Sequence, residues 1–245
     1  MKVVVLGGSG LVGSQVVGIL GGQGHEVLAA SPSTGVNTLT GEGVEAALAG
    51  AEVVVDVTNT ADFSQARAFF TTSTVTLLKA AEAAGVKHLV ALSIVGVDTV
   101  PDSDSGYLQA KVAQEQLIEA GAVPYTIVRA TQFFEFAQGI AGMSTGEDGK
   151  AHLSTAYIQP IAASEVARIV AEVAVGQPRQ GHVDIAGPQR FGLDEYIRLA
   201  VPEIEVVTDE SAGYAGVQLQ PTTLVPVGEA VLSEVTLAAW QEAQR

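Results

Sequence analysis

The fold of this chain is decided by one stretch near its start, Val3-Val4-Val5-Leu6-Gly7-Gly8-Ser9-Gly10-Leu11-Val12-Gly13. The apolar run predicts a buried parallel strand, and the apolar residues spaced at helical intervals beyond the glycines predict a helix. A glycine turn between a strand and a helix N-terminus forms an anion site, because backbone N–H groups and the helix dipole point at it. The usual occupant is a dinucleotide pyrophosphate. The alternative is a tight turn that serves only close packing of the helix on the strand.

The glycine spacing is G-x-x-G-x-x-G, because Gly7, Gly10 and Gly13 lie three residues apart, and Gly8 adds a fourth glycine. We predict that this turn binds the cofactor, together with a threonine that follows a later strand. The predicted binding residues of this group are Gly7, Ser9, Gly10, Leu11, Val12, Gly13 and Thr58.

Apolar, β-branched runs alternate with helical stretches along residues 1–130, which is typical of repeated βαβ units. Beyond the first unit, strands are predicted at residues 25–30, 52–57, 87–93 and 125–129, with a weak one at 36–39. Helices are predicted at residues 43–49, 63–84 and 110–120. We therefore predict an α/β fold, a Rossmann-like doubly wound parallel sheet.

The pattern changes near residue 130, where the chain becomes rich in aromatic residues. Further on, a helix is predicted at residues 163–175, a short strand at 182–186 and a helix at 191–200. We predict two parts of one structural unit. Residues 1–130 form the dinucleotide-binding core, and residues 131–245 complete the sheet and add a small C-terminal substrate-binding lobe.

Composition narrows the class of protein. A chain of 245 residues with 47% hydrophobic content can bury a full core. The formal net charge of −15 argues against a nucleic-acid partner, since phosphate backbones need clustered Lys and Arg. No apolar run approaches a membrane span of about 18 residues. With no cysteine and no predicted signal peptide, we expect a cytoplasmic enzyme acting on a small molecule. The oligomeric state stays open, and a homodimer is one option.

Three residues form the predicted catalytic group. Ser93 ends a predicted strand, and the carboxyl ends of parallel strands face the ligand. Tyr107 and Lys111 are four residues apart on a predicted helix and therefore share a face. A nearby ammonium is expected to lower the pKa of the phenol, so that Tyr107 exchanges a proton with a carbonyl oxygen. The alternative is an aromatic residue at a loop edge and an exposed helical lysine.

Through the glycine turn, Ser93 and the Tyr107–Lys111 pair, the chain resembles the atypical short-chain dehydrogenase/reductases of the NmrA-like NAD(P)-binding family. The resemblance implies a Rossmann fold, NAD(P)(H) binding and redox chemistry at a carbonyl or alcohol. The family often has an asparagine in the long helix after the fourth strand, but residues 71–76 contain none, so a proton relay through it is not supported. Besides the glycine turn, Ser93, Tyr107 and Lys111, the matching segments are Gly85-Val86-Lys87-His88-Leu89-Val90, Tyr125-Thr126-Ile127-Val128-Arg129, Ile161-Ala162-Ala163-Ser164-Glu165-Val166-Ala167 and Ala186-Gly187-Pro188.

The sequence favours NADP(H), with NAD(H) as the alternative. NAD-selective sites place an acid about 20 residues beyond the glycines, and here Ala30 and Ser31 occupy that region. Ser31, Ser33 and Thr34 are predicted to hydrogen-bond a 2′-phosphate, although turn chemistry around Pro32 also explains them. Lys111 is the further predicted cofactor contact, at the nicotinamide ribose.

We predict an NAD(P)H-dependent oxidoreductase of the carbonyl reductase or alcohol dehydrogenase type, with a small or medium apolar carbonyl or alcohol as substrate. The alternatives are a non-catalytic NAD(P) redox sensor and a nucleotide-dependent epimerase or isomerase. The four histidines lack metal-ligand spacing, so no metal is expected. Aromatic residues in this part of a chain also serve as core. The predicted substrate contacts are Gln132, Phe133, Phe136 and Met143.

Overall fold

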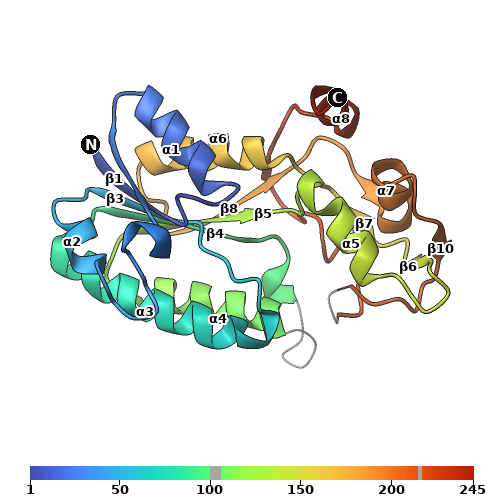
Figure 1. Ribbon diagram of the computed structural model, residues 1–245, viewed down its shortest axis with the longest axis horizontal. Coiled ribbons are helices and arrows are strands. Elements are labelled where there is room, and N and C mark those ends of the chain that lie inside the picture. Colours follow the sequence, from blue (N-terminus) through green and yellow to red (C-terminus); the bar gives the residue numbers. More distant parts are fainter. Residues whose placement is uncertain (100–105, 215–216) are drawn as a thin grey trace. The chain divides into compact units, whose positions relative to one another are not determined.

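The computed structural model describes residues 1–99, 106–214 and 217–245. Its central element is a seven-stranded parallel sheet with the strand order β11-β8-β5-β4-β3-β1-β2, which confirms the predicted fold class (Figure 1). The strands are β1 (Lys2–Leu6), β2 (Glu26–Ala30), β3 (Val53–Asp56), β4 (His88–Ile94), β5 (Tyr125–Ala130), β8 (Gly181–Ala186) and β11 (Ala230–Leu232).

The order of the strands reverses at β1. This strand pairs in parallel with β2 on one side and with β3 on the other, so that Leu6 lies beside both Ala30 and Asp56. The chain runs from β1 to β2 at one edge of the sheet and then returns past β1 to β3, from which it continues toward the other edge. Doubly wound sheets bind ligands at the carboxyl ends of the strands at such a reversal. The glycine turn, which directly follows Leu6, therefore lies at the position where the fold favours a ligand.

Helices cover both faces of the sheet (Figure 1). On one face lie α1 (Gly13–Gly22) and α6 (Ala163–Val175), and on the other lie α3 (Ala66–Ala84) and α4 (Gly106–Ala120). The short helix α2 (Val44–Leu48) precedes β3 and packs beside α3. Because every strand in the middle of this sheet is covered twice, its residues are apolar in continuous runs instead of alternating.

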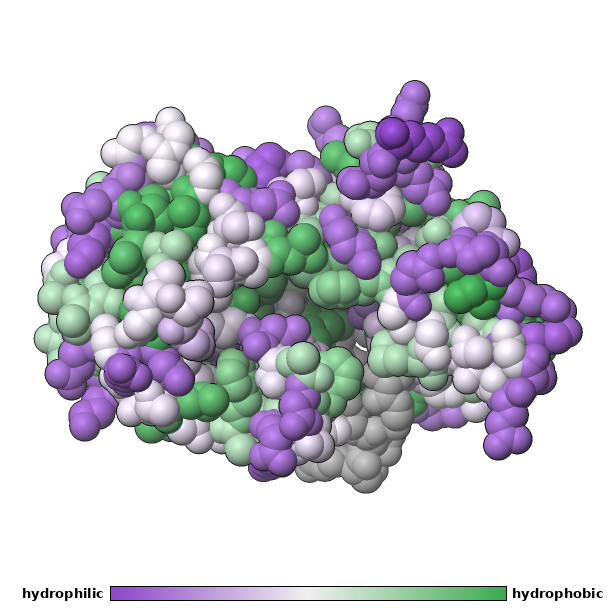
Figure 2. Space-filling model, viewed as in Figure 1, coloured by the Kyte–Doolittle hydropathy of each residue, from purple (hydrophilic) through white to green (hydrophobic). Residues whose placement is uncertain are grey.

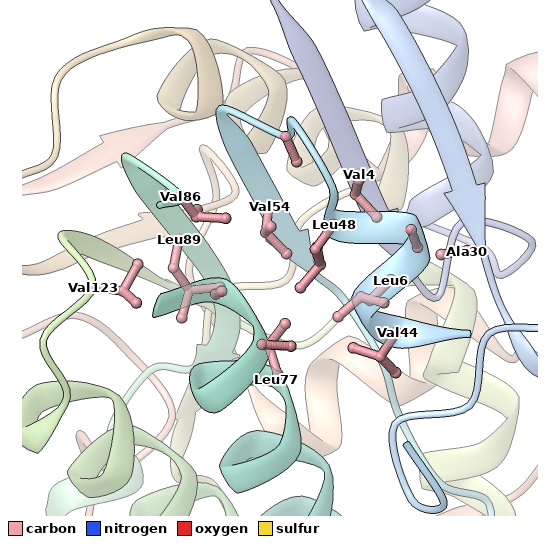
Figure 3. Packing of buried hydrophobic residues seen from close by; sticks show 14 of the residues in the cluster. Val4, Leu6, Ala30, Val44, Leu48, Val54, Leu77, Val86, Leu89 and Val123 are labelled. Carbon is pink, nitrogen blue, oxygen red and sulfur yellow. The ribbon is translucent and has the colours of Figure 1, made fainter. Parts of the chain in front are cut away.

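The core between the sheet and helices α2 and α3 explains why the apolar runs form strands. Val4, Val54 and Leu89 come from three neighbouring strands and point toward Leu48 and Leu77 on the two helices (Figure 3). All five side chains are almost completely buried. Burying one such side chain stabilises the fold by about 1.5–3 kcal/mol, so this cluster fixes the faces that the helices present to the sheet.

The chain forms two compact units. The first contains residues 1–93, 106–129 and 166–183, and the second contains the other described residues. One boundary falls after Arg129, next to the domain division predicted at residue 130, which stays a prediction.

The second unit has its own core, in which Phe134, Ile140 and Tyr196 are fully buried. Hydrophilic groups gather over its last helix, where the chain ends in Gln241-Glu242-Ala243-Gln244-Arg245 (Figure 2). Its further elements are α5 (Ala137–Met143), β6 (Ala151–Leu153), β7 (Tyr157–Ile158), β9 (Phe191–Gly192), α7 (Leu193–Ala200), β10 (Val206–Thr208) and α8 (Leu237–Ala243).

The weak strand predicted at residues 36–39 is wrong. Gly35, Gly41 and Gly43 adopt left-handed conformations with φ of +81°, +81° and +70°, which fold this segment into turns. The side chain of Asn37 accepts the N–H of Leu39 at 2.9 Å, a local bond that competes with strand pairing. The sheet consequently ends at β2. The helix predicted at residues 191–200 begins in the structure at Leu193, two residues later than predicted, because Phe191–Gly192 pairs with β7 as strand β9.

Among the helices in the described part of the chain, none has both the length and the apolar character required to cross a membrane.

The glycine turn generates a stability prediction. A Cβ atom on Gly13 would lie 2.1 Å from the carbonyl oxygen of Gly7, whereas one on Gly10 would meet only that oxygen, at 3.3 Å. We expect Gly13→Ala to lower the free energy of unfolding by about 1–3 kcal/mol or more, because backbone must move, and Gly10→Ala to change it by less than about 1 kcal/mol. Urea unfolding followed by circular dichroism measures both. Equal stability of the two variants would contradict the tight packing of α1 on the turn.

Candidate functional site

The glycine turn is held between the ends of β2 and β3. The N–H groups of Gly7 and Gly8 both donate to the carbonyl oxygen of Ala30, at 2.9 and 3.3 Å. Gly7 has a φ of +77°, and a Cβ atom on it would lie 2.9 Å from the carbonyl oxygen of Val57. A side chain at this position is therefore excluded both by conformation and by space.

The start of α1 is open to an anion. Within the described residues no side chain caps this helix, and its first turn contains no acidic residue. Ser9, Gly10 and Leu11 are exposed, so the turn lies at the surface. A Cβ atom on Gly10 would project from the turn with a single contact to the protein, which leaves the room that the backbone needs to approach a phosphate. These residues fit a dinucleotide pyrophosphate.

The loop after β2 carries the predicted hydroxyl groups. The N–H of Ser31 donates to Oγ1 of Thr34 at 2.9 Å, and the hydroxyls of Ser31 and Ser33 lie 2.8 Å apart. These bonds build the short helical turn Pro32–Thr34, so the turn-chemistry explanation is supported for Ser31 and Thr34. Ser33 and Thr34 remain exposed, and residues 27–41 contain neither an acid nor a base. Their contact with a 2′-phosphate stays a prediction.

A buried carboxylate ends β3 and was missed by the sequence interpretation. Asp56 is 3% exposed, and one of its oxygens accepts the N–H and the hydroxyl of Thr58 at 3.0 and 2.7 Å. The other oxygen accepts Nε2 of Gln114 at 3.0 Å. Because the hydroxyl hydrogen of Thr58 is committed to Asp56, the oxygen of Thr58 is left to accept a hydrogen bond from a ligand. Thr58 also lies beside Gly7, and its contact with the cofactor stays a prediction.

Lys111 is buried and does not extend into solvent. The residue is only 3% exposed. Its Nζ donates to the carbonyl oxygen of Leu92 at 2.8 Å and to Oε1 of Gln114. The ammonium also lies 4.4 Å from the centre of the Phe70 ring, a cation–π contact. Burial lowers the pKa of Lys111 to about 8, although the charges of Asp56 and Glu115 act to raise it. The alternative of an exposed helical lysine is therefore wrong.

Tyr107 reaches a different partner. Its hydroxyl donates to Oδ1 of Asn59 at 3.0 Å, and its ring lies 5.0 Å from that of Phe63 and 5.9 Å from that of Phe70. Burial raises the pKa of Tyr107, with the hydrogen bond to Asn59 acting to lower it. The expectation that Lys111 lowers this pKa is wrong. The two residues start from one face of α4, but the ammonium is bound at the end of β4 and the phenol at the loop after β3.

Ser93 is a buried hydroxyl on β4. The residue is 4% exposed, and no hydrogen-bond partner for Oγ exists among the described residues. Leaving a polar group buried and unpaired costs about 1–3 kcal/mol, a cost that a bound substrate oxygen would remove. The carbonyl oxygen of the preceding residue, Leu92, accepts a hydrogen bond from the ammonium of Lys111, so Lys111 contacts the strand backbone next to Ser93.

A buried ion pair links α4 to the sheet. Arg129, at the end of β5, donates to both carboxylate oxygens of Glu115 at 3.1 and 2.6 Å. Glu115 and Gln114 follow Lys111 by one helical turn, and this Lys-x-x-Gln-Glu spacing was the only available signal for them. Because such bidentate pairs are geometrically specific, the pair fixes the rotation of α4 against the sheet.

The predicted substrate residues belong to the second unit. Phe133 and Phe136 stack with their ring centres 5.1 Å apart, and Phe136 and Met143 are 47% and 58% exposed. Oε1 of Gln132 is buried without a partner among the described residues. Phe134, the aromatic residue between the stacked pair, is core. The contact of these four residues with substrate stays a prediction.

Comparison with known proteins adds a family and a fold. A family model described as NAD(P)H-binding matches residues 7–175. A reductase of (4-alkanoyl-5-oxo-2,5-dihydrofuran-3-yl)methyl phosphate from Streptomyces griseus is 27% identical over an alignment of 207 residues. The match covers 79% of this chain and 70% of that protein.

Two solved structures share the fold. The dTDP-4-dehydrorhamnose reductase of Bacillus anthracis in complex with NADP has a TM-score of 0.67 at 14% identity, covering 85% of this chain and 84% of its own. The UDP-glucose 4-epimerase of Thermus thermophilus in complex with NAD has a TM-score of 0.65 at 17% identity, covering 100% of this chain and 94% of its own.

The depressed pKa of Lys111 generates a pH prediction. In the folded protein Lys111 loses its proton near pH 8. In the unfolded chain the ammonium keeps its proton up to about pH 10.5. The unfolded state therefore binds more protons between these values, and this residue makes stability rise with pH there by on the order of 3 kcal/mol. We expect urea unfolding at pH 7.5 to 10.5 to show this rise in the wild type relative to Lys111→Met. Parallel pH profiles would contradict the burial of the ammonium.

Proposed function

Because the chain belongs to the NAD(P)H-binding family, we propose that it is an oxidoreductase that transfers a hydride between NADP(H) and a small or medium apolar carbonyl compound or alcohol. The observation that carries the proposal is the placement of Ser93, Lys111 and Tyr107 around the ends of β3 and β4. This edge of the sheet also carries the glycine turn. A hydroxyl donor, a cation and a phenol are the groups that carbonyl reduction requires.

In this mechanism Tyr107 is the proton donor. Burial raises the pKa of Tyr107, so the phenol is protonated at neutral pH and is ready to give its proton to the oxygen of the reduced carbonyl. The hydroxyl of Ser93 donates a hydrogen bond to the same oxygen as negative charge develops on it. Bound NADPH supplies the hydride. In the reverse direction, the phenolate of Tyr107 accepts the proton of the alcohol.

Lys111 has a positioning and a binding role. An ammonium has three donors, and two of them reach Leu92 and Gln114. In the proposed mechanism the third binds a hydroxyl of the nicotinamide ribose in exchange for the contact with the Phe70 ring. Through the carbonyl of Leu92, Lys111 also fixes the strand end that carries Ser93.

We favour NADP(H) over NAD(H) as the cofactor. The loop after β2 exposes Ser33 and Thr34, and the acids nearest in sequence are Glu26 and Glu42, on either side of it. The hydroxyl of Thr34 is engaged by the backbone of the turn, so Ser33 is the residue that we assign to the 2′-phosphate first. A carboxylate would repel a 2′-phosphate and would favour NAD. Solved structures with this fold contain NADP in one case and NAD in another.

A carbonyl compound that carries a phosphate is the second candidate substrate. The Streptomyces griseus relative is named for such a compound. In the second unit, the guanidinium of Arg190 lies 5.8 Å from the ring centre of Tyr157, and its Nε and one terminal nitrogen lie 3.4 Å from Oε1 of Gln159. These partners are neutral, so they orient Arg190 without cancelling its charge, which suits a phosphate.

The test is NADPH consumption with a panel of apolar ketones, aldehydes and quinones and a set of phosphorylated hydroxymethyl ketones. We expect Tyr107→Phe to lower kcat by about 10²–10⁴-fold with a compound that the wild type reduces, because the proton donor is lost. Tyr125→Phe is the matched control, since Tyr125 begins β5, at the end of the parallel strands opposite to the one that carries the glycine turn, and it should retain full activity. Undiminished turnover by Tyr107→Phe would remove Tyr107 from the mechanism. Tight NADPH binding without turnover of any compound would favour a redox sensor.

A further inference from the structure

We propose that Asn59 is a positioning residue that holds the hydroxyl of Tyr107 in both of its protonation states. The proposal rests on the function proposed above, in which Tyr107 gives and takes a proton. Asn59 was not among the residues predicted from the sequence. It lies in the loop after β3, 48 residues before Tyr107, and is brought to it only by the fold.

Among the residues that the structure describes, the phenol has one polar side-chain partner. The ring of Tyr107 is held by Phe63 and Phe70, and its hydroxyl reaches Oδ1 of Asn59 at 3.0 Å. The same oxygen accepts the N–H of Thr60 at 2.9 Å, which orients the amide. Asn59 itself is exposed, so the hydrogen bond between the phenol and the amide lies next to solvent, whereas the ring packs against the two phenylalanines.

An amide suits this position because it can serve the phenol and the phenolate. The neutral phenol donates its hydrogen to Oδ1. Once that proton has moved to the substrate oxygen, the phenolate is an acceptor. Rotation of the amide by half a turn, which gives up the hydrogen bond from the N–H of Thr60, then presents Nδ2–H to the phenolate. A hydrogen bond to an ionised oxygen is roughly twice as strong as one between neutral groups. Asn59 consequently opposes the effect of burial, which alone disfavours the phenolate.

Two charged groups of the described residues, one on α4 and one beside Phe63, are bound elsewhere. The ammonium of Lys111 binds Leu92 and Gln114, and the carboxylate of Asp62, next to Phe63, accepts the N–H and hydroxyl of Ser64. The shift in the pKa of Tyr107 has burial and Asn59 as its causes. Asn59 is therefore the group whose replacement should change the ionisation of Tyr107 most directly.

The sequence offers a matched control. The chain contains two asparagines, Asn37 and Asn59. Asn37 accepts the N–H of Leu39 at 2.9 Å in an exposed turn. Asn37→Asp thus makes the same chemical change as Asn59→Asp, adds the same charge, and leaves Tyr107 untouched.

The experiment follows the ionisation of Tyr107 by NMR of protein labelled with ¹³C at Cζ of tyrosine, with Tyr107→Phe assigning the signal. Aspartate has the shape of asparagine but cannot donate, and it adds a like charge. We expect Asn59→Asp to reduce the ionised fraction of Tyr107 at a given alkaline pH at least tenfold, Asn59→Ala to reduce it less, and Asn37→Asp to leave it unchanged. In steady-state assays, kcat should fall for both Asn59 variants while the KM for NADPH is retained.

Unchanged ionisation of Tyr107 in both Asn59 variants would overturn the proposal, whatever their activity. An equal shift in Asn37→Asp would overturn it as well, because the effect would then be one of net charge. The NMR titration requires no substrate, so it decides the role of Asn59 even where full turnover by Tyr107→Phe refutes the function proposed for Tyr107.

Discussion

The candidate site depends on the buried ammonium of Lys111. A cation without water is stable only where acceptors surround it, and here the carbonyl of Leu92, the amide of Gln114 and the face of Phe70 do so. The charge of Asp56 is linked to it through Gln114. These contacts join α4 to the ends of β3 and β4. Because Tyr107 lies one turn before Lys111 on α4, the place of the phenol follows from the place of the ammonium.

Two constraints of different kind converge on this edge of the sheet. At β1 the constraint is steric, since Gly7 and Gly13 leave no room for a side chain and so bring a strand, a turn and a helix start together. At β3 and β4 it is electrostatic, since buried charges need particular partners. In the function that we propose, the first holds the phosphates of the cofactor and the second serves proton transfer. A hydride-transferring enzyme needs both on one sheet edge, because the cofactor links them.

The sequence predicted those features that are local. Apolar runs predicted the central strands, and the glycine spacing predicted the turn, because both patterns act within a few neighbouring residues. The strand predicted at residues 36–39 is wrong because three glycines in left-handed conformations fold this segment into turns despite its apolar residues. Asn59 and Asp56 could not be predicted, since their partners Tyr107 and Gln114 are 48 and 58 residues away. The four-residue spacing of Tyr107 and Lys111 predicted that the ammonium acts on the phenol. In the structure each of them binds a partner that is distant in sequence, Asn59 for Tyr107 and Leu92 for Lys111.

The central claim is that one sheet edge binds the dinucleotide and presents the proton donor. A crystal structure of the protein with NADPH tests it most directly. The account predicts the pyrophosphate on the turn from Gly7 to Gly13, the 2′-phosphate at the loop from Ser31 to Thr34, and the nicotinamide beside Ser93 and Tyr107. A nicotinamide bound away from Ser93 and Tyr107, or a pyrophosphate bound away from the glycine turn, would contradict it.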